Sequence, residues 1–288
     1  MKDKLLEEYP DWLFPYAYNI LGSTDDAKDA VQDVLSNYIS KEADTDIDNI
    51  KGYLVKSVVN QSINIKKRRS RTVSDNVRLP EPVATENADT NLHLNDIVSY
   101  AMLILLDQLT IKERAVFVLK EAFNYSHKEI AEVLNSTIDN SRKLLSRAKQ
   151  KLKSAAPTEL VVQEKKKSKD YLADYINAIR SRDTHKLEQL FADEIVVVAD
   201  GGDKVRVVRN VTEGVAECAA LLLKVYDMYQ QKQTMKIAEV NHQPAILYYY
   251  KDTLTTCQVF TLDSENRIVK ISSIIDADKL KNIALTLA

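Results

Sequence analysis

The chain has 288 residues, which is long for one domain and predicts two or three. Hydrophobic residues make up 45% and charged residues 28%, with 5 glycines and 6 prolines, so collagen-like, low-complexity and fully disordered proteins are excluded. The apolar run 100–106 is much shorter than the roughly 20 residues that span a bilayer. The acidic N-terminus does not resemble a signal peptide, and we therefore expect a cytoplasmic protein without a membrane anchor. Cys218 and Cys257 fit no disulfide framework and are expected to be reduced.

Charge is distributed unevenly, although the formal net charge is only −2. Residues 1–50 hold 4 basic and 12 acidic side chains, whereas residues 51–71 hold 7 basic side chains and no acidic one. Further basic blocks occupy residues 142–153 and 165–169, and the last of these follows Pro157 and is interpreted as a linker. Clustered Lys and Arg in helical sequence are typical of phosphate contact, and different faces are therefore expected to meet different partners.

The first half of the chain has the apolar spacing of helices. Residues 27–38 repeat at i, i+3, i+4 and i+7, with Ser23 or Thr24 as the predicted N-cap. An acidic loop over 41–49 precedes a helix predicted over about 50–67. The periodicity fails from 72 to 91, where Leu79-Pro80-Glu81-Pro82 favours an extended linker. Helical spacing then resumes from about Leu92 to Ser154.

Residues 126–152 have the pattern of a helix-turn-helix. Ser126 is the predicted cap of the first helix, Asn135 tolerates the left-handed turn, and Ser136 or Thr137 caps the second helix. The inner face of the second helix is predicted from Ile138, Leu144 or Leu145, Ala148 and Leu152. Its outer face is basic, which favours DNA recognition over a simple helical hairpin.

After about residue 168 the pattern changes to α+β. A helix is predicted over 171–182 and another over about 217–231, which packs across a mainly antiparallel sheet. Strands are predicted over 195–199, 205–211, 245–250, 254–262 and 267–275. Asp200-Gly201-Gly202-Asp203 is interpreted as the hairpin turn between the first two.

The sequence resembles a known family at several separate motifs. The stretch 109–119, with Tyr125-Ser126, Glu129-Ile130-Ala131 and Arg147-Ala148, is similar to the promoter −35-reading domain of extracytoplasmic-function sigma factors of the sigma-70 family. Residues 26–33 are similar to the motif by which that family docks on bacterial core RNA polymerase, and residues 53–69 to its −10-reading helix. The resemblance implies a factor for promoter recognition and transcription initiation.

The resemblance also implies residue roles. Polymerase binding is carried over to Asp29, Gln32 and Asp33. The family's base-selecting loop corresponds in position to residues 44–49. Where the family often has Arg, Asp and an apolar residue, this chain has Val59, Asn64 and Ser141. The residues expected to contact promoter DNA are Lys56, Asn60, Lys66, Lys67, Arg68, Arg69, Thr137, Asp139, Asn140, Arg142, Lys143 and Arg147.

The C-terminal extension resembles a SnoaL-like domain of the nuclear-transport-factor-2-like cone fold. Sigma factors with this extension typically carry Asp-Gly-Gly-Gly-Lys, Leu-Pro-Glu-Pro and Asn-Pro-Asp-Lys-Leu motifs, and near matches occur at 200–204, 79–82 and 276–280. The resemblance implies regulation in cis instead of by a separate anti-sigma protein. The implied regulatory contacts are Leu79, Pro80, Glu81, Pro82, Asp200, Gly201, Gly202, Lys204, Asp278, Lys279 and Leu280.

Two other functions remain open from the sequence. SnoaL-like folds include enzymes, so Asp200 could act as a base and Tyr248, Tyr249 or Tyr250 as a hydrogen-bond donor, or the cone could sense a small-molecule ligand. A dimeric repressor is the other alternative, although a monomer is expected for the free protein. No catalytic residue, metal, nucleotide or other cofactor is predicted.

The predicted fold class is multidomain, with two all-α domains followed by the α+β cone domain. The predicted boundaries are 1–71 for sigma region 2, 72–92 for a linker, 93–155 for sigma region 4, 156–168 for a second linker and 169–288 for the SnoaL-like regulatory domain.

Overall fold

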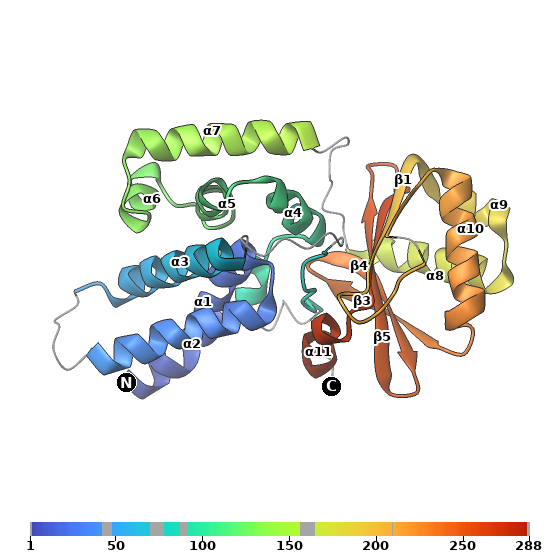
Figure 1. Ribbon diagram of the computed structural model, residues 1–288, viewed down its shortest axis with the longest axis horizontal. Coiled ribbons are helices and arrows are strands. Elements are labelled where there is room, and N and C mark those ends of the chain that lie inside the picture. The colour runs from blue at the N-terminus through green and yellow to red at the C-terminus, as the bar shows by residue number, and fades with distance from the viewer. Residues whose placement is uncertain are drawn as a thin grey trace. The chain divides into compact units, whose positions relative to one another are not determined.

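The computed structural model describes residues 2–41, 48–69, 78–86, 92–155, 165–208 and 210–286. The chain forms two compact units (Figure 1). The first comprises residues 1–74, 87–98 and 102–157, and the second comprises 75–86, 99–101 and 158–288. Residues 78–86, which the sequence predicts to be linker, therefore belong to the second unit. Most of the predicted base-selecting loop lies outside the described residues.

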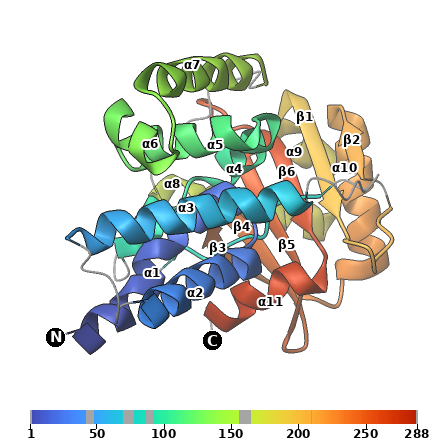
Figure 2. The ribbon, with the colours of Figure 1, turned by 60° about the vertical axis from the view of Figure 1, so that its left-hand side comes forward.

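Three long helices form the first part of the N-terminal unit: α1 (Lys2–Leu21), α2 (Thr24–Lys41) and α3 (Ile50–Arg69) (Figure 2). The cap of α2 is Ser23, whose Oγ accepts the Asp26 N–H at 3.2 Å. Asp25 and Asp26 lie in the first turn, where the helix dipole favours negative charge. The predicted apolar stripe is confirmed, since Ala27, Ala30, Val31 and Val34 are all buried.

The second part of this unit contains the helix-turn-helix. Its elements are η1 (Leu92–Asp96), α4 (Tyr100–Leu105), η2 (Leu106–Gln108), α5 (Ile111–Phe117), the π-helix η3 (Val118–Ala122), α6 (His127–Val133) and α7 (Ile138–Ala155). Ser126 and Glu129 form a capping box at α6, and Asn135 has a φ of 47° in the turn. Thr137 caps α7 by accepting the Asn140 N–H at 3.1 Å. One inner-face prediction is wrong, because Ile138 is 39% exposed and Leu145 is the first apolar residue of α7 that is buried.

The C-terminal unit is a six-stranded sheet with helices on one face. Its strands lie in the order β2-β1-β6-β5-β4-β3, and only the β1/β6 pair is parallel. Helices α8, α9 and α10 lie beside the sheet (Figure 1). Their side chains and those of the sheet form an apolar core. The elements are α8 (Lys165–Ser181), α9 (Thr184–Gln189), β1 (Phe191–Asp200), β2 (Val211–Glu213), α10 (Val215–Val225), the π-helix η4 (Tyr226–Gln230), β3 (Thr234–Val240), β4 (Gln243–Tyr250), β5 (Thr253–Leu262), β6 (Ile268–Ile274) and α11 (Ala277–Thr286).

The predicted order of fold classes is confirmed: two helical parts precede an α+β unit. Two local predictions are wrong. The strand expected over 205–211 is reduced to Val211–Glu213, because Val205 N–H bonds back to the Gly201 carbonyl at 3.1 Å and the chain leaves the edge of β1. The basic block 165–169 is not a linker but the start of α8, in keeping with the good helix propensity of lysine.

No helix among the described residues is both long and apolar enough to cross a membrane. Nor does the described part of the chain bring together three or more His, Cys, Asp or Glu side chains in a way that could hold a metal ion. The free cysteines Cys218 and Cys257 are both buried, and burial raises the pKa of each thiol.

Candidate nucleic-acid interface and linker-binding site

The candidate polymerase-docking face lies on α2. Asp29, Gln32 and Asp33 are exposed to solvent, on the side of the helix opposite its buried stripe. An Oδ2 atom of Asp33 accepts a hydrogen bond from Gln61 Nε2 of α3 at 2.9 Å. The structure therefore brings the three residues together on one accessible face of an anchored helix.

The candidate −10-reading residues lie on α3, and several of them make contacts within the protein. The amide of Asn60 donates to the Lys56 carbonyl at 2.7 Å and to the Val133 carbonyl at 2.9 Å, at the end of α6. Since Val133 belongs to the helix-turn-helix, this bond joins the two helical parts of the unit. Lys67 and Arg68 are exposed at the end of α3.

Lys66 is the most enclosed of the candidate DNA-binding cations. Its Nζ donates to the Leu21 carbonyl at 3.1 Å and pairs with Asp107 at 3.2 Å. Desolvation, assisted by the nearby Arg114 guanidinium, lowers the pKa of Lys66 to about 8. Arg69 pairs with Asp26 of α2 at 2.5 Å. Asn60, Lys66 and Arg69 are thus engaged by protein groups in this conformation.

Arg114 of α5, which belongs to the motif over 109–119, joins the elements around α3. Its side chain is fully buried, its Nε donates to the Asn19 carbonyl at 2.9 Å, and its Nη1 bonds Asp107. Among the described residues its Nη2 has no hydrogen-bond partner. The available signal in the sequence was an arginine directly before the apolar run 115–119. Arg114 and Lys66 share Asp107, whose side chain is 44% exposed, and their bonds to the Asn19 and Leu21 carbonyls join α1, α3 and α5.

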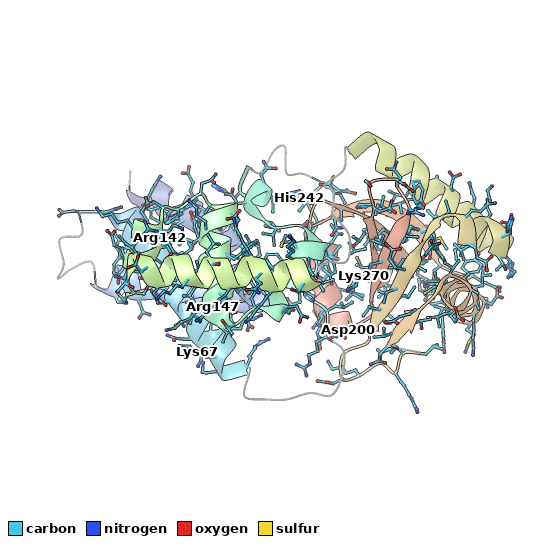
Figure 3. The ribbon with its side chains drawn as sticks, turned by 90° about the horizontal axis from the view of Figure 1, so that it is seen from above. Lys67, Arg142, Arg147, Asp200, His242 and Lys270 are labelled. Carbon is cyan, nitrogen blue, oxygen red and sulfur yellow. The ribbon has the colours of Figure 1, made fainter. Side chains whose placement is uncertain are left out.

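The candidate −35-reading residues of α7 are more exposed to solvent than Asn60 and Lys66 of α3. Figure 3 shows Arg142 and Arg147 along this helix, with their side chains directed away from its axis. Arg142 pairs only with Asp139 at 3.2 Å on the surface. Ser141 is buried and bonds His127 Nδ1 at 2.9 Å, which explains why a polar residue is accepted there. The exposed candidates on this helix and its cap are Thr137, Asp139, Asn140, Arg142, Lys143 and Arg147.

In the C-terminal unit the three predicted regulatory motifs converge on one cluster. The Leu79 N–H donates to Asp200 Oδ2 at 2.6 Å, and Lys279 Nζ donates to both the Leu79 carbonyl and Asp200 Oδ2, each at 2.6 Å. The other carboxylate oxygen of Asp200 accepts the Gly202 N–H at 2.8 Å. We call Leu79, Asp200, Gly202 and Lys279 the latch. Asp200 is only 1% exposed, so its charge depends on these donors.

The surroundings of the latch fix its geometry. Gly202 has a φ of +62°, and a Cβ there would lie 2.3 Å from a carboxylate oxygen of Asp276, so only glycine fits. Lys204 pairs with Asp278 at 2.6 Å on the surface, and this lysine lowers the pKa of Asp278 to about 2 together with Lys281. Leu280 is buried beneath this turn. A Cβ on Gly201 would lie 2.1 Å from the Val205 carbonyl oxygen, so glycine is needed here as well.

A second anchor holds the same segment at the free edge of β3. Asn241 accepts the Val83 N–H at its Oδ1 and donates its own N–H to the Val83 carbonyl, both at 2.9 Å. Thr85 N–H bonds the Glu239 carbonyl at 3.0 Å, so the segment pairs with the edge as a short added strand. Tyr100 Oη donates to the Pro80 carbonyl at 2.7 Å. Leu79, Pro80 and Pro82 are buried, and Glu81 is half-buried.

The sequence analysis missed the residues of this second anchor. Asn241 and His242 both have positive φ and form the two-residue turn between β3 and β4, a pattern that asparagine favours. That turn could be read from the sequence once β3 was recognised. The pairing of Val83 with Asn241 joins residues 158 positions apart, and no local pattern predicts it.

Comparisons with known proteins match two regions of the N-terminal unit. Residues 5–72 match the model of sigma-70 region 2, and residues 101–152 match that of sigma-70 region 4. The chain is 27% identical over 147 residues to a Mycobacterium tuberculosis protein described as "Probable ECF RNA polymerase sigma factor SigI", covering 49% of this chain and 50% of that protein. It is 25% identical over 226 residues to the ECF RNA polymerase sigma factor SigJ of the same organism, covering 75% and 70%.

The likeness to SigJ extends to the fold. The crystal structure of M. tuberculosis SigJ superposes with a TM-score of 0.74 at 18% identity, covering 98% of this chain and 99% of that one. The alignment with SigI spans about half the length of that relative. The chain therefore contains sigma-70 regions 2 and 4 in order, at residues 5–72 and 101–152. The relatives named above are described as ECF sigma factors, and the similarity in fold to SigJ extends over the C-terminal unit as well.

Proposed function

We propose that this protein binds bacterial core RNA polymerase in the cytoplasm and directs promoter recognition and transcription initiation. The observation that carries the proposal is the ordered pair of sigma-70 regions, each with its candidate contact face on a helix held by a buried core. In this proposal Asp29, Gln32 and Asp33 dock on the polymerase. The basic side chains of α3 read the −10 element, and those of α7 read the −35 element.

Regulation in cis is the second part of the proposal. The segment 78–86 lies between the two sigma-70 regions in sequence, and the C-terminal unit holds it at the latch and at the edge of β3. The spacing of the −10 and −35 regions on a promoter depends on the connection between them. A protein that fixes the connecting segment therefore controls which separations the two regions can reach.

The contacts of Asn60, Lys66 and Arg69 support a rearrangement of side chains on α3 when DNA binds. These side chains contact protein groups in the N-terminal unit, and DNA requires the same donors. We infer that α3 must exchange those contacts for phosphate and base contacts when a promoter binds. Asp200 is occupied by the latch and does not line the cavity of the cone, so the function proposed here is not enzymatic.

The deciding experiment is run-off transcription with bacterial core polymerase on a promoter library. The wild type is expected to give specific transcripts, and Asp29→Lys or Asp33→Lys is expected to weaken core binding at least tenfold. Asp11→Lys is the matched control, because it makes the same charge reversal at an exposed position of α1. Core binding that is equal in all four proteins would contradict the docking face, and no initiation by the wild type would contradict the function.

The latch is tested by Asp200→Asn combined with Lys279→Met. Loss of the charged pair is expected to speed hydrogen exchange of the Leu79 amide at least tenfold and to change transcript yield or promoter choice. Lys281→Met is the control, since Lys281 pairs with Asp278 outside the latch at 2.7 Å. Faster exchange without any change in transcription would contradict regulation through this segment.

A further inference from the structure

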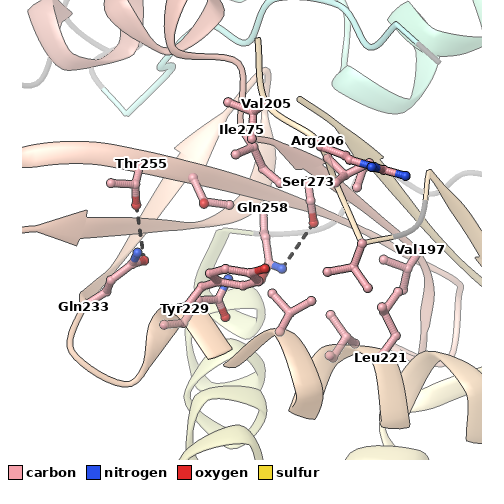
Figure 4. A pocket seen from close by; sticks show the side chains of 17 residues that line it. Val197, Val205, Arg206, Leu221, Tyr229, Gln233, Thr255, Gln258, Ser273 and Ile275 are labelled. Carbon is pink, nitrogen blue, oxygen red and sulfur yellow. Dashed lines mark hydrogen bonds between the residues drawn. The ribbon is translucent and has the colours of Figure 1, made fainter. Parts of the chain in front are cut away.

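The C-terminal unit contains a cavity of about 280 Å³ that the proposed function does not use. It lies between the faces of β1, β5 and β6 and the helices α10 and η4, and residues 205–208 form one wall (Figure 4). Its walls are largely apolar, and Val197, Ala199, Leu221 and Val225 are among them. A well-packed interior leaves few voids of this size, so a cavity this large in a folded unit needs an explanation.

Among the polar residues that line this cavity, Gln258 is buried and held by hydrogen bonds. Gln258 is 2% exposed, its Oε1 accepts the Tyr248 hydroxyl at 2.7 Å, and its Nε2 donates to Ser273 Oγ at 3.2 Å. The tyrosine bond orients the amide so that Nε2 has a second N–H to offer. In the described part of the chain neither that N–H nor the Ser273 hydroxyl hydrogen has an acceptor. Buried donors without acceptors are costly, which makes them a site for an accepting group.

The mouth of the cavity is also unusual. Val205, Val208 and Tyr229 line it and are 41%, 42% and 57% exposed, although each is a large apolar or aromatic residue. Tyr229 lies on η4, and a π-helical turn at the end of an α-helix often marks a functional site. Exposed apolar residues gathered at one opening mark a site where an apolar molecule enters.

We propose that the cavity binds a small, neutral, mainly apolar molecule with one hydrogen-bond-accepting group, such as a medium-chain ketone. The volume equals that of about nine liquid waters, which corresponds to on the order of ten non-hydrogen atoms. The carbonyl oxygen accepts from Gln258 Nε2 and Ser273 Oγ, and the chain contacts Val197, Leu221 and Val225. Arg206 is the charged residue of the lining and is exposed at the mouth, so a carboxylate placed beside Gln258 would be buried without a cation.

The same cavity adjoins the latch along the backbone. Ala199 and Ile275 line it, Asp200 follows Ala199, and the Ile275 N–H bonds the Asp200 carbonyl at 2.8 Å. Val205, at the mouth, bonds Gly201 within the latch turn. A bound molecule therefore touches residues one position from Asp200, and its occupancy is linked to the docking of Leu79. Only this linkage rests on the proposed function; binding itself does not.

Binding is tested on the full chain with 2-nonanone, followed by the ¹⁵N side-chain amide signal of Gln258. Leu221→Trp and, separately, Val225→Trp fill the cavity and are expected to weaken binding at least tenfold. Met228→Trp is the matched control, because Met228 is exposed on η4 and does not line the cavity. Thermal unfolding of each variant establishes that it is folded. No shift of the Gln258 amide in the wild type, or equal binding by both cavity-filling variants, would overturn the site.

Two further measurements separate the parts of the inference. Nonanoate is expected to bind at least tenfold more weakly than 2-nonanone, and tighter binding of nonanoate would overturn the neutral-ligand assignment. Saturation with 2-nonanone is expected to change hydrogen exchange of the Leu79 amide at least threefold. Binding with unchanged exchange would overturn the linkage alone. None of these measurements uses polymerase. Their results can therefore be interpreted even if the proposed transcription function is wrong.

Discussion

The basic helices α3 and α7 of the N-terminal unit look alike in sequence and differ in the structure. Both carry runs of Lys and Arg without an acidic residue, from Lys51 to Arg69 and from Arg142 to Lys153. On α3, Lys66 and Arg69 are paired with carboxylates from α2 and η2. On α7, Lys143 and Arg147 are exposed and form no ion pair within the described residues.

The number of Lys and Arg residues in a helix gives its positive charge. It does not show whether that charge is available to bind DNA. Availability depends on which acidic and carbonyl groups the fold brings to the helix. Asp107 and the Leu21 carbonyl reach Lys66 because α3 is packed between other helices. On α7, Lys149 and Lys151 also pair with Glu121 and Glu113. Lys143 and Arg147 face solvent, so these two cations can meet phosphate without first giving up a partner within the described residues.

The largest effect on stability is expected for Arg114→Met. This substitution removes one member of the Arg114, Asp107 and Lys66 cluster, which contacts α3. The substitution leaves the Asn19 carbonyl without its buried donor and removes one of the two cations on Asp107. Because the Asn19 carbonyl is left without its donor, we expect a loss of about 2 kcal/mol in the free energy of unfolding, measured by urea denaturation. Lys112→Met, at an exposed position of the same helix, is the control and should cost little. An equal loss of stability in both variants would contradict a stabilising role for the contacts of Arg114.

A smaller effect is expected on DNA binding, and it separates the two helices directly. Arg147→Ala and Lys143→Ala should each reduce the slope of log affinity against log salt for duplex DNA by about 0.9. Lys66→Met should leave this slope unchanged for the free protein, because Lys66 is engaged by Asp107 and the Leu21 carbonyl. The measurement is fluorescence anisotropy over a salt series. Equal slopes for the Arg147 and Lys66 variants would contradict the comparison.

Features set by neighbours along the chain could be predicted from the sequence. The buried stripe of α2, the Ser126 cap, the Asn135 turn and three of the strands were all predicted close to their observed positions. Each depends on residues within a turn or two, where capping and periodicity act. The α+β fold class followed from the same local signals.

Features that depend on distant partners could not be predicted in this way. The resemblance supplied Leu79, Asp200 and Lys279, but not the pairing of Val83 with Asn241, since edge pairing depends on the register of the whole sheet. β2 was misplaced because the bond from Val205 to Gly201 overrides the strand propensity of residues 205–211. The engagement of Lys66 was missed for the same reason, as its partners lie 41 and 45 residues away.

The smallest expected effect is the pH dependence of stability that Lys66 causes. The pKa of Lys66 is about 8 in the folded protein against an ordinary 10.5, so between these pH values the unfolded chain binds more protons than the folded one. Stability from this group therefore rises with pH from about 8 to 10.5, and its penalty is fully present below pH 8. Lys66→Met removes the titration. The melting temperature of the variant relative to wild type should be highest at pH 7 and should fall as the pH rises toward 10.

The control for this prediction is Lys67→Met, because Lys67 is the next residue on α3 and is exposed. Its melting temperature relative to wild type should stay constant over the same pH range. Both variants retain the buried tyrosines and cysteines, whose titration cancels in each difference. If the difference in melting temperature between Lys66→Met and wild type does not depend on pH, Lys66 is solvated in solution. Its charge would then be as accessible to DNA as those of Lys143 and Arg147 on α7.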